Sequence, residues 1–325
     1  MNPLNPLNPL TYLHYDVFTR EPLLGNQLAV FPDARGLTTD RMQAIAREIN
    51  FSETTFVFPP ERPDTDVRMR IFTPAVEMPM AGHPTVGSTF ALAHVGVIEP
   101  ARARFVFGLN VGPTPVDLVW ENERLLFAWM TQKPPSFGPP VADRGAVASA
   151  IGLGESDLAA GLPIQEVTCG VPYLLVPLRE REAVDRATPP SMNLELQGLS
   201  RAHPAMLLFA RDIRLKPDST YSRMFAPGLG VVEDPATGSA AGPLGCYLVQ
   251  HRMVGTAEAA PDGAPNGPVQ IVNIQGVKMG RASRIHMAIT GAPDAITDVK
   301  VGGEAVLVAR GEFLATSSPA DRVAC

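Results

Sequence analysis

Short, largely apolar stretches recur at close intervals along this chain, and their composition predicts strands. The predicted strands are rich in β-branched and aromatic residues and cover Tyr12–Phe18, Leu28–Phe31, Glu53–Phe58, Val67–Phe72, Leu125–Met130, Val171–Pro177, Ala205–Ala210, Val269–Ile274, Arg284–Ile289 and Ala305–Ala309. Apolar residues at helical spacing are rarer and predict helices at Thr39–Ile49, Asp143–Ile151 and Glu155–Ala160. The pattern as a whole predicts a β-rich α+β fold.

Two further segments are small or apolar on every side, which predicts helices that are surrounded by protein. They are Thr85–Val95, which follows Ala81–Pro84, and Ser239–Met253, which follows Asp234–Gly238. A glycine follows each segment and gives a stop signal. We therefore expect two central helices.

The sequence before each central helix repeats, which indicates a duplicated domain. Arg70–Pro74 resembles Arg223–Pro227 at an offset of 153 residues, and Ala81 and Pro235 are 154 residues apart. Chance similarity between short apolar stretches is the alternative explanation. The repeat predicts two pseudo-symmetric barrel-like domains, each with its strands wrapped around one helix.

The domain limits follow from the repeat and from proline. We expect the first domain at residues 11–132 and the second at 141–316, with the join in the proline-rich Lys133–Pro140. The terminal strand or tail is expected to return to the first domain. Residues 1–10 contain Asn-Pro-Leu three times and are predicted to be a flexible extension.

Composition narrows the classes of function. Hydrophobic residues make up 45% of the 325 residues, but no apolar run reaches the length of a membrane span. The net charge of −6, without a basic run, argues against a nucleic-acid partner and favours a small molecule. Three widely spaced cysteines fit neither a disulfide framework nor a zinc site, the histidines lack zinc-ligand spacing, and a reducing cytoplasm is expected.

The two predicted helix starts carry candidate chemistry. A helix N-terminus presents unpaired N–H groups and the positive end of its dipole, so it attracts an anion. Gly82 and Gly238 let a ligand approach the backbone, while Thr237 and Ser239 add hydroxyl groups. We predict that these four residues bind the carboxylate of a small substrate. The alternative is that they only cap and pack the helices.

An ordered set of motifs over nearly the whole chain resembles the PhzF-like proteins of phenazine biosynthesis. The segments that carry the resemblance are Asp16–Thr19, Gly25–Val30, Asn50–Phe56, Phe72–Pro74, Glu77–Pro84 and Glu233–Ala240. The resemblance implies the diaminopimelate-epimerase-like fold, in which two barrel-like halves each enclose a helix. It also implies a metal-free and cofactor-free isomerase related to trans-2,3-dihydro-3-hydroxyanthranilate isomerase, and a homodimer.

The same resemblance implies roles for four residues, which we expect to be catalytic. Glu53 matches the glutamate that shuttles a proton, and His83, Asp234 and Ser239 match the other site residues. Burial would raise the pKa of a lone carboxyl toward neutrality and make it a useful acid/base. Alternatively, Glu53 is an exposed residue at a strand end, Asp234 is a helix cap and His83 is an ordinary hydrogen-bonded histidine.

Two alternative functions remain open at this point. One is a non-catalytic protein that binds small carboxylates, and the other is an epimerase. Related two-cysteine epimerases carry thiols at the cleft positions that correspond here to Ala81 and Pro235, so a second base is not evident. Gln275–Gly276 and Met279–Ser283 resemble a signature of the family, but Ile274 and Ala282 replace its usual glutamate and proline, which leaves the role of Arg281 open.

Overall fold

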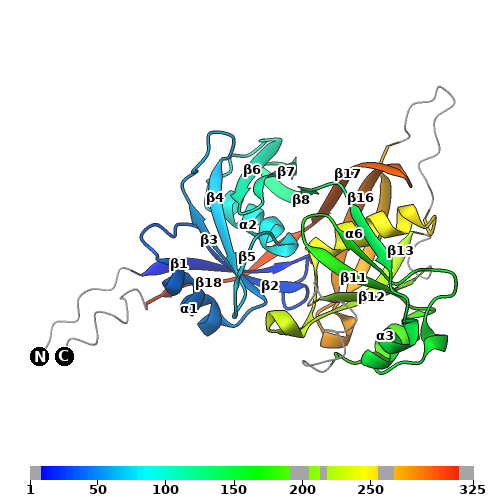
Figure 1. The fold of residues 1–325 in the computed structure, drawn as a ribbon. Helices are drawn as coiled ribbons and strands as arrows, with labels where there is room; N and C mark the ends of the chain where they lie inside the picture. The colour runs from blue at the N-terminus through cyan, green and yellow to red at the C-terminus, as the bar shows by residue number, and fades with distance from the viewer. Residues whose placement is uncertain (1–8, 191–204, 213–217, 255–266, 315–325) are drawn as a thin grey trace, which may run out of the picture.

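Two similar halves lie side by side in the computed structural model, which describes residues 9–190, 205–212, 218–254 and 267–314 (Figure 1). The strands of the first half are β1 (Leu10–Val17), β2 (Asn26–Phe31), β3 (Glu53–Phe58), β4 (Val67–Phe72), β5 (Glu77–Met78), β6 (Arg104–Leu109), β7 (Gly112–Glu121), β8 (Arg124–Gln132) and the C-terminal β18 (Ala305–Phe313). Those of the second half are β9 (Ser136–Pro140), β10 (Gln165–Thr168), β11 (Pro172–Pro177), β12 (Met206–Arg211), β13 (Ser219–Ala226), β14 (Val231–Asp234), β15 (Val269–Gln275), β16 (Ser283–Ala292) and β17 (Ala295–Gly303).

The helices are fewer than the strands. They are α1 (Thr39–Ile49), α2 (Gly82–His94), α3 (Arg144–Ala150), α4 (Arg181–Arg186) and α6 (Gly238–Gln250), with short 3₁₀ turns η1 (Glu155–Asp157), η2 (Pro227–Leu229) and η3 (Val277–Met279). Among the described helices, none is long and apolar enough to cross a membrane.

Strand pairing follows the same order and sense in both halves. In the first half the order is β18–β1–β2–β3–β4–β6–β7–β8, and only β2–β3 and β4–β6 are parallel. The second half repeats it as β9–β10–β11–β12–β13–β15–β16–β17, with β11–β12 and β13–β15 parallel. Antiparallel pairing of β8 with β17 joins the halves. The internal repeat predicted from short motifs therefore extends over the strand order of the whole fold.

One arginine–glutamate ion pair in the first half has an equivalent in the second half. Arg70 donates to both carboxylate oxygens of Glu77, and Arg223 does the same with Glu233. Each guanidinium also lies over the phenylalanine two residues further on, at 5.2 and 4.8 Å from the ring centre. The correspondence between the two halves therefore extends to individual side chains.

The two central helices are buried along nearly their whole length, as their apolar sequences predicted (Figure 1). α2 begins at Gly82, three residues before the predicted start, because Pro84 fits in a first turn where no N–H partner is needed. α6 begins at Gly238 and ends at Gln250, three residues before the predicted end. Arg252 adopts the left-handed conformation just beyond α6, so this residue, and not a glycine, ends the helix.

Every predicted strand is present, Glu53–Phe58 and Val67–Phe72 with the predicted bounds and the others with shifted ends, but several strands were not predicted. These include β7, whose Pro113 and Pro115 disguise its alternation, and β10, which has only four residues. The helix predicted at Glu155–Ala160 is wrong, because only the turn η1 forms there. The fold class, α+β with two barrel-like halves around central helices, is confirmed.

The chain crosses from one half to the other before β9 and again before β18. β9 lies in the segment predicted as the join and pairs with β10, while β18 returns to pair with β1. Of the extension predicted for residues 1–10, only positions 9 and 10 are described, and Leu10 already belongs to β1. Residues 315 and 316, the predicted end of the second domain, lie outside the described residues.

Candidate acid/base site between the two helix starts

The first turns of α2 and α6 meet directly. A Cβ atom placed on Gly82 would lie 2.4 Å from Gly238 Cα, so only glycine permits this approach. Neither helix has a side-chain cap, because Ala81 has no polar group and the Thr237 hydroxyl donates to Asp234 Oδ2 at 2.6 Å. The N–H groups of both first turns are thus left without a capping side chain in one small region.

Aligning the two halves by their helix starts changes the residue of the second half that is equivalent to Ala81. Gly82 and Gly238 each open a helix and are 156 residues apart, so Ala81 corresponds to Thr237 and not to Pro235. The offset grows from 153 because η2 lengthens the second half by three residues before β14. Neither Ala81 nor Thr237 carries a thiol, so the absence of a two-cysteine pair holds with the corrected positions.

Glu53 and His83 form the ionisable pair of the site. Glu53 is the first residue of β3, His83 is the second residue of α2, and Oε2 lies 3.0 Å from Nδ1. The Glu53 side chain is 14% exposed and that of His83 is 2% exposed, so the sequence alternatives of an exposed strand-end glutamate and an ordinary histidine do not describe them. A buried carboxyl and a buried imidazole face each other here.

Burial and mutual charge shift both groups. Burial raises the pKa of Glu53; His83 opposes this and Asp234 adds to it, leaving the pKa above its ordinary value. Burial lowers the pKa of His83, but the Glu53 carboxylate and Asp234 raise it by more. The pair therefore retains a proton at pH values where a free carboxyl and a free imidazole would have lost theirs.

Asn26, the first residue of β2, fixes which partner the imidazole uses. Its amide nitrogen has two hydrogens, and acceptors for both are Asp234 Oδ1 at 2.7 Å and the Ala236 carbonyl at 2.9 Å. The same nitrogen lies 3.1 Å from His83 Nδ1 but has no hydrogen left for it. The proton at Nδ1 is therefore shared with Glu53 and not with Asn26.

Asp234 is held by several donors and is not a helix cap. It ends β14, three residues before the N-cap Thr237, and its carboxylate accepts from Asn26 and from Thr237. The Gln275 amide donates to the Asp234 carbonyl at 2.8 Å and to Thr237 Oγ1 at 2.9 Å. Sequence reasoning assigned no role to Asn26 or Gln275, although both lie in quoted motifs.

A small cavity lies among these groups. Its volume is about 30 Å³, and it is lined by Ser52, Glu53, Thr73, Met78, Gly82, His83, Tyr173, Met224, Ala226, Val231, Asp234, Thr237, Gly238 and Ser239. All seven residues predicted from the sequence as catalytic or substrate-binding are among them. In the described part of the chain, no group of three His, Cys, Asp or Glu side chains could hold a metal ion.

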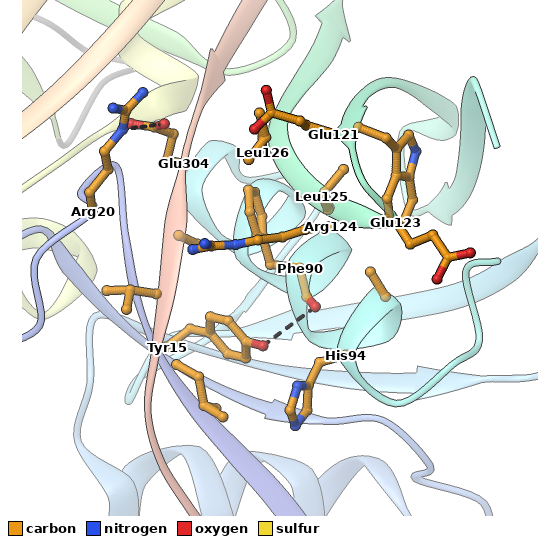
Figure 2. Close-up of a pocket in the computed structure, with 15 residues that line it drawn as sticks. Tyr15, Arg20, Phe90, His94, Glu121, Glu123, Arg124, Leu125, Leu126 and Glu304 are labelled. Carbon is orange, nitrogen blue, oxygen red and sulfur yellow. Dashed lines mark hydrogen bonds and ion pairs between the residues drawn. The ribbon is translucent and has the colours of Figure 1, made fainter. Parts of the chain in front are cut away.

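Figure 2 shows a larger cavity of about 760 Å³ beside the C-terminal half of α2, between β8 and β18. Its Arg20 and Glu304 form an ion pair with each other, and its other carboxylates, at the β7–β8 turn, are exposed. Acid/base chemistry favours the smaller cavity, because only there is a carboxyl shielded from water and in contact with an imidazole.

The second half has no carboxyl group at the position equivalent to Glu53. Strand pairing places Phe72 opposite the residue after Glu53, and the equivalent Phe225 opposite the residue after Ala205. Ala205 therefore occupies the position that Glu53 has in the first half. One carboxyl, and not a symmetric pair, faces the cleft from these two strands.

Arg281 has a supporting contact with the site. Its guanidinium pairs with buried Asp16 and donates to the carbonyl oxygens of Leu24 and Gly25, just before Asn26. Arg281 thus ties the second half to the loop that positions Asn26, and it does not line the cavity.

A buried carboxyl–imidazole pair, enclosed with two uncapped helix starts, makes this cavity the candidate site of acid/base chemistry. The family model of phenazine biosynthesis-like proteins (PhzC-PhzF) matches residues 15–311, and the chain belongs to that family.

Curated relatives agree with this membership. An uncharacterised isomerase of Mesorhizobium japonicum is 37% identical over 313 residues, covering 93% of this chain and 98% of that protein. The trans-2,3-dihydro-3-hydroxyanthranilate isomerase of Pseudomonas aeruginosa is 36% identical over 304 residues, covering 92% and 98%. The crystal structure of a PhzF-family protein of Bacillus anthracis has a TM-score of 0.80 at 28% identity, covering 94% and 99%. The enzyme class of the family is isomerase.

Proposed function

We propose that this isomerase moves a proton within a small unsaturated carboxylic or amino acid, without a cofactor, and that Glu53 is the single acid/base. The observation that carries the proposal is the contact of 3.0 Å between the buried Glu53 carboxyl and His83. A carboxyl with a raised pKa can both accept and return a proton near neutral pH. The related substrate trans-2,3-dihydro-3-hydroxyanthranilate, named for the Pseudomonas aeruginosa relative, belongs to this class.

In the proposed reaction, Glu53 removes a proton from one carbon and the bonding electrons move into the conjugated system. Glu53 then returns the proton to a second carbon, so the enzyme ends in its starting state. The substrate carboxylate lies at the helix starts, where Gly82, Gly238 and Ser239 leave backbone N–H groups accessible. Asp234 offers a carboxylate to a substrate amine, while Met78 and Met224 give an apolar wall.

The two halves must separate before such a ligand binds. A cavity of about 30 Å³ holds one water molecule, whereas small-molecule sites commonly have roughly 300 Å³ or more. The cavity is formed by residues of both halves, so relative movement of the halves opens it. Closure afterwards would exclude water from the reacting carbons.

Glu53→Gln tests the proposal. The amide keeps the size of the side chain but cannot take up a proton, so turnover and exchange of substrate C–H for deuterium should both be abolished while anthranilate binding is retained. Glu48→Gln on the exposed face of α1 is the matched control and should behave as wild type. Unchanged exchange in Glu53→Gln would contradict the assignment.

The alternatives give different results in the same experiments. A non-catalytic binding protein would bind carboxylic acids in the wild type without any exchange. An epimerase would invert a stereocentre, which chiral analysis of the product detects. The presence of Ala205 at the position equivalent to Glu53 favours a single-base proton shift over a two-base inversion.

Three expectations from the sequence stay proposals here. They are the domain limits at residues 11–132 and 141–316, the homodimer and the cytoplasmic location. Limited proteolysis, sedimentation equilibrium and cell fractionation test them in that order.

A further inference from the structure

The cleft contains a buried phenol that sequence reasoning did not identify. Tyr173 is the second residue of β11, is 3% exposed, and lines the same cavity as Glu53 and Asp234. Its hydroxyl oxygen lies 2.7 Å from Oγ of Ser239 in the first turn of α6. Two hydroxyl groups are therefore paired inside the cavity.

The chemistry of the two groups decides the direction of this hydrogen bond. Burial raises the pKa of Tyr173, the bond to Ser239 opposes this, and the negative charges of Glu53 and Asp234 add to the rise, so the phenol stays protonated. A phenol is the stronger donor of the two, so Tyr173 donates and Ser239 Oγ accepts. The one Ser239 hydroxyl hydrogen is then free to point into the cavity.

This hydroxyl pair exists only in the second half. Ser239 is the second residue of α6, and His83 has that position in α2. In the first half Leu28 pairs with Glu53, whereas in the second half Tyr173 takes the place of Leu28 beside Ala205. The cleft thus has a proton-transfer end at Glu53 and His83 and a hydroxyl end at Tyr173 and Ser239.

We propose that Tyr173 is a positioning residue that acts through Ser239: by donating to Ser239 Oγ, it directs the serine hydroxyl hydrogen to the substrate carboxylate. Hydrogen bonds in such a chain strengthen one another, so the charge of the carboxylate is met by a better donor than serine alone. The two ends of the cleft then fix the direction of the substrate, with its carboxylate at Ser239 and its reacting carbons at Glu53. This inference rests on the proposed binding of a carboxylic acid in the cleft.

A double-mutant cycle with Tyr173→Phe, Ser239→Ala and the double variant tests the proposal. The probes are anthranilate and aniline, which differ only in the carboxylate, and calorimetry measures their dissociation constants. We expect anthranilate binding to weaken ~2–10-fold in Tyr173→Phe and roughly tenfold or more in Ser239→Ala, because a charged hydrogen bond is weakened or lost. Tyr173→Phe should cause no further loss in the Ser239→Ala background, and aniline binding should change in none of the variants.

Tyr247→Phe is the matched control. Its hydroxyl is also buried and donates to the Pro163 carbonyl at 2.6 Å, but it lies outside the cavity. It should lower the melting temperature without changing anthranilate binding. In turnover assays Tyr173→Phe should raise KM more than it lowers kcat, which a general loss of stability would not produce.

The outcomes separate this inference from the proposed function. If the wild type binds anthranilate and its exchange depends on Glu53, but Tyr173→Phe binds anthranilate normally, the role of Tyr173 is wrong and the function stands. The role of Tyr173 would also be wrong if Tyr173→Phe weakened anthranilate binding equally in the wild type and in Ser239→Ala, because Tyr173 would then act on the ligand directly and not through Ser239. If the wild type does not bind anthranilate, the carboxylate cleft itself is refuted, and the positioning role with it.

Discussion

The substitution Gly82→Ala tests the close contact between the starts of α2 and α6. The added Cβ would lie 2.4 Å from Gly238 Cα, Gly238 C and Ser239 N, all of them backbone atoms that cannot rotate away. An ordinary van der Waals contact begins at 3.4 Å, so the two helix starts must separate by about 1 Å. His83 and Ser239 directly follow Gly82 and Gly238 in the sequence and would move with the helix starts.

The expected magnitude follows from this displacement. Misplacing reacting groups by about 1 Å costs on the order of 100-fold in rate, so kcat/KM should fall by roughly that factor. Overpacking a closed contact costs about 1–3 kcal/mol, and the melting temperature should drop by several degrees. Gly238→Ala should be milder, because its added Cβ would lie 2.9 Å from the Phe18 ring and 3.0 Å from Gly82 Cα, so a smaller displacement relieves the overlap.

Thermal unfolding and steady-state kinetics measure both effects. Gly145→Ala is the matched control: it places alanine in the first turn of α3, where the nearest atom is a side-chain oxygen at 3.7 Å. We expect this control to leave kcat/KM unchanged and to stabilise the protein by about 0.4–1 kcal/mol. Wild-type activity and melting temperature in Gly82→Ala would refute the direct contact between the helix starts.

The ionisable groups give two further predictions. In Glu53→Gln the burial of His83 remains while the carboxylate that raises its pKa is gone, so its imidazole should lose its proton at a lower pH than in the wild type. NMR titration of the histidine ring hydrogens measures this, and an unchanged pKa would mean that Glu53 does not hold the proton. Arg281→Ala leaves Asp16 buried without its cation and should destabilise the fold by about 3 kcal/mol, whereas Arg284→Ala, at an exposed position nearby, should not. Denaturant unfolding compares the two variants, and equal stabilities would contradict a tie between the halves through Arg281.

Local sequence patterns predicted those elements whose burial is uniform along their length. The central helices are apolar on every side, so their existence followed from composition alone, and the strand β3 with Glu53 at its start followed from its β-branched and aromatic residues. The ends of the two central helices were less accurate, because Pro84 and Arg252 act through backbone geometry that residue type indicates only weakly. The seven predicted site residues share one cavity because the fold brings together the starts of β3, α2 and α6 and the end of β14.

The sequence by itself determined the duplicated architecture and the central helices, since each of these is encoded in neighbouring residues, and its resemblance to the family singled out Glu53. Only the tertiary structure decided what those residues meet. Tyr173 and Ser239 are 66 residues apart, and Asn26 and Asp234 are 208 residues apart, so no local pattern connects them. The equivalence of Ala81 with Thr237 likewise depends on where the two helices begin, and that of Glu53 with Ala205 depends on strand register within each half.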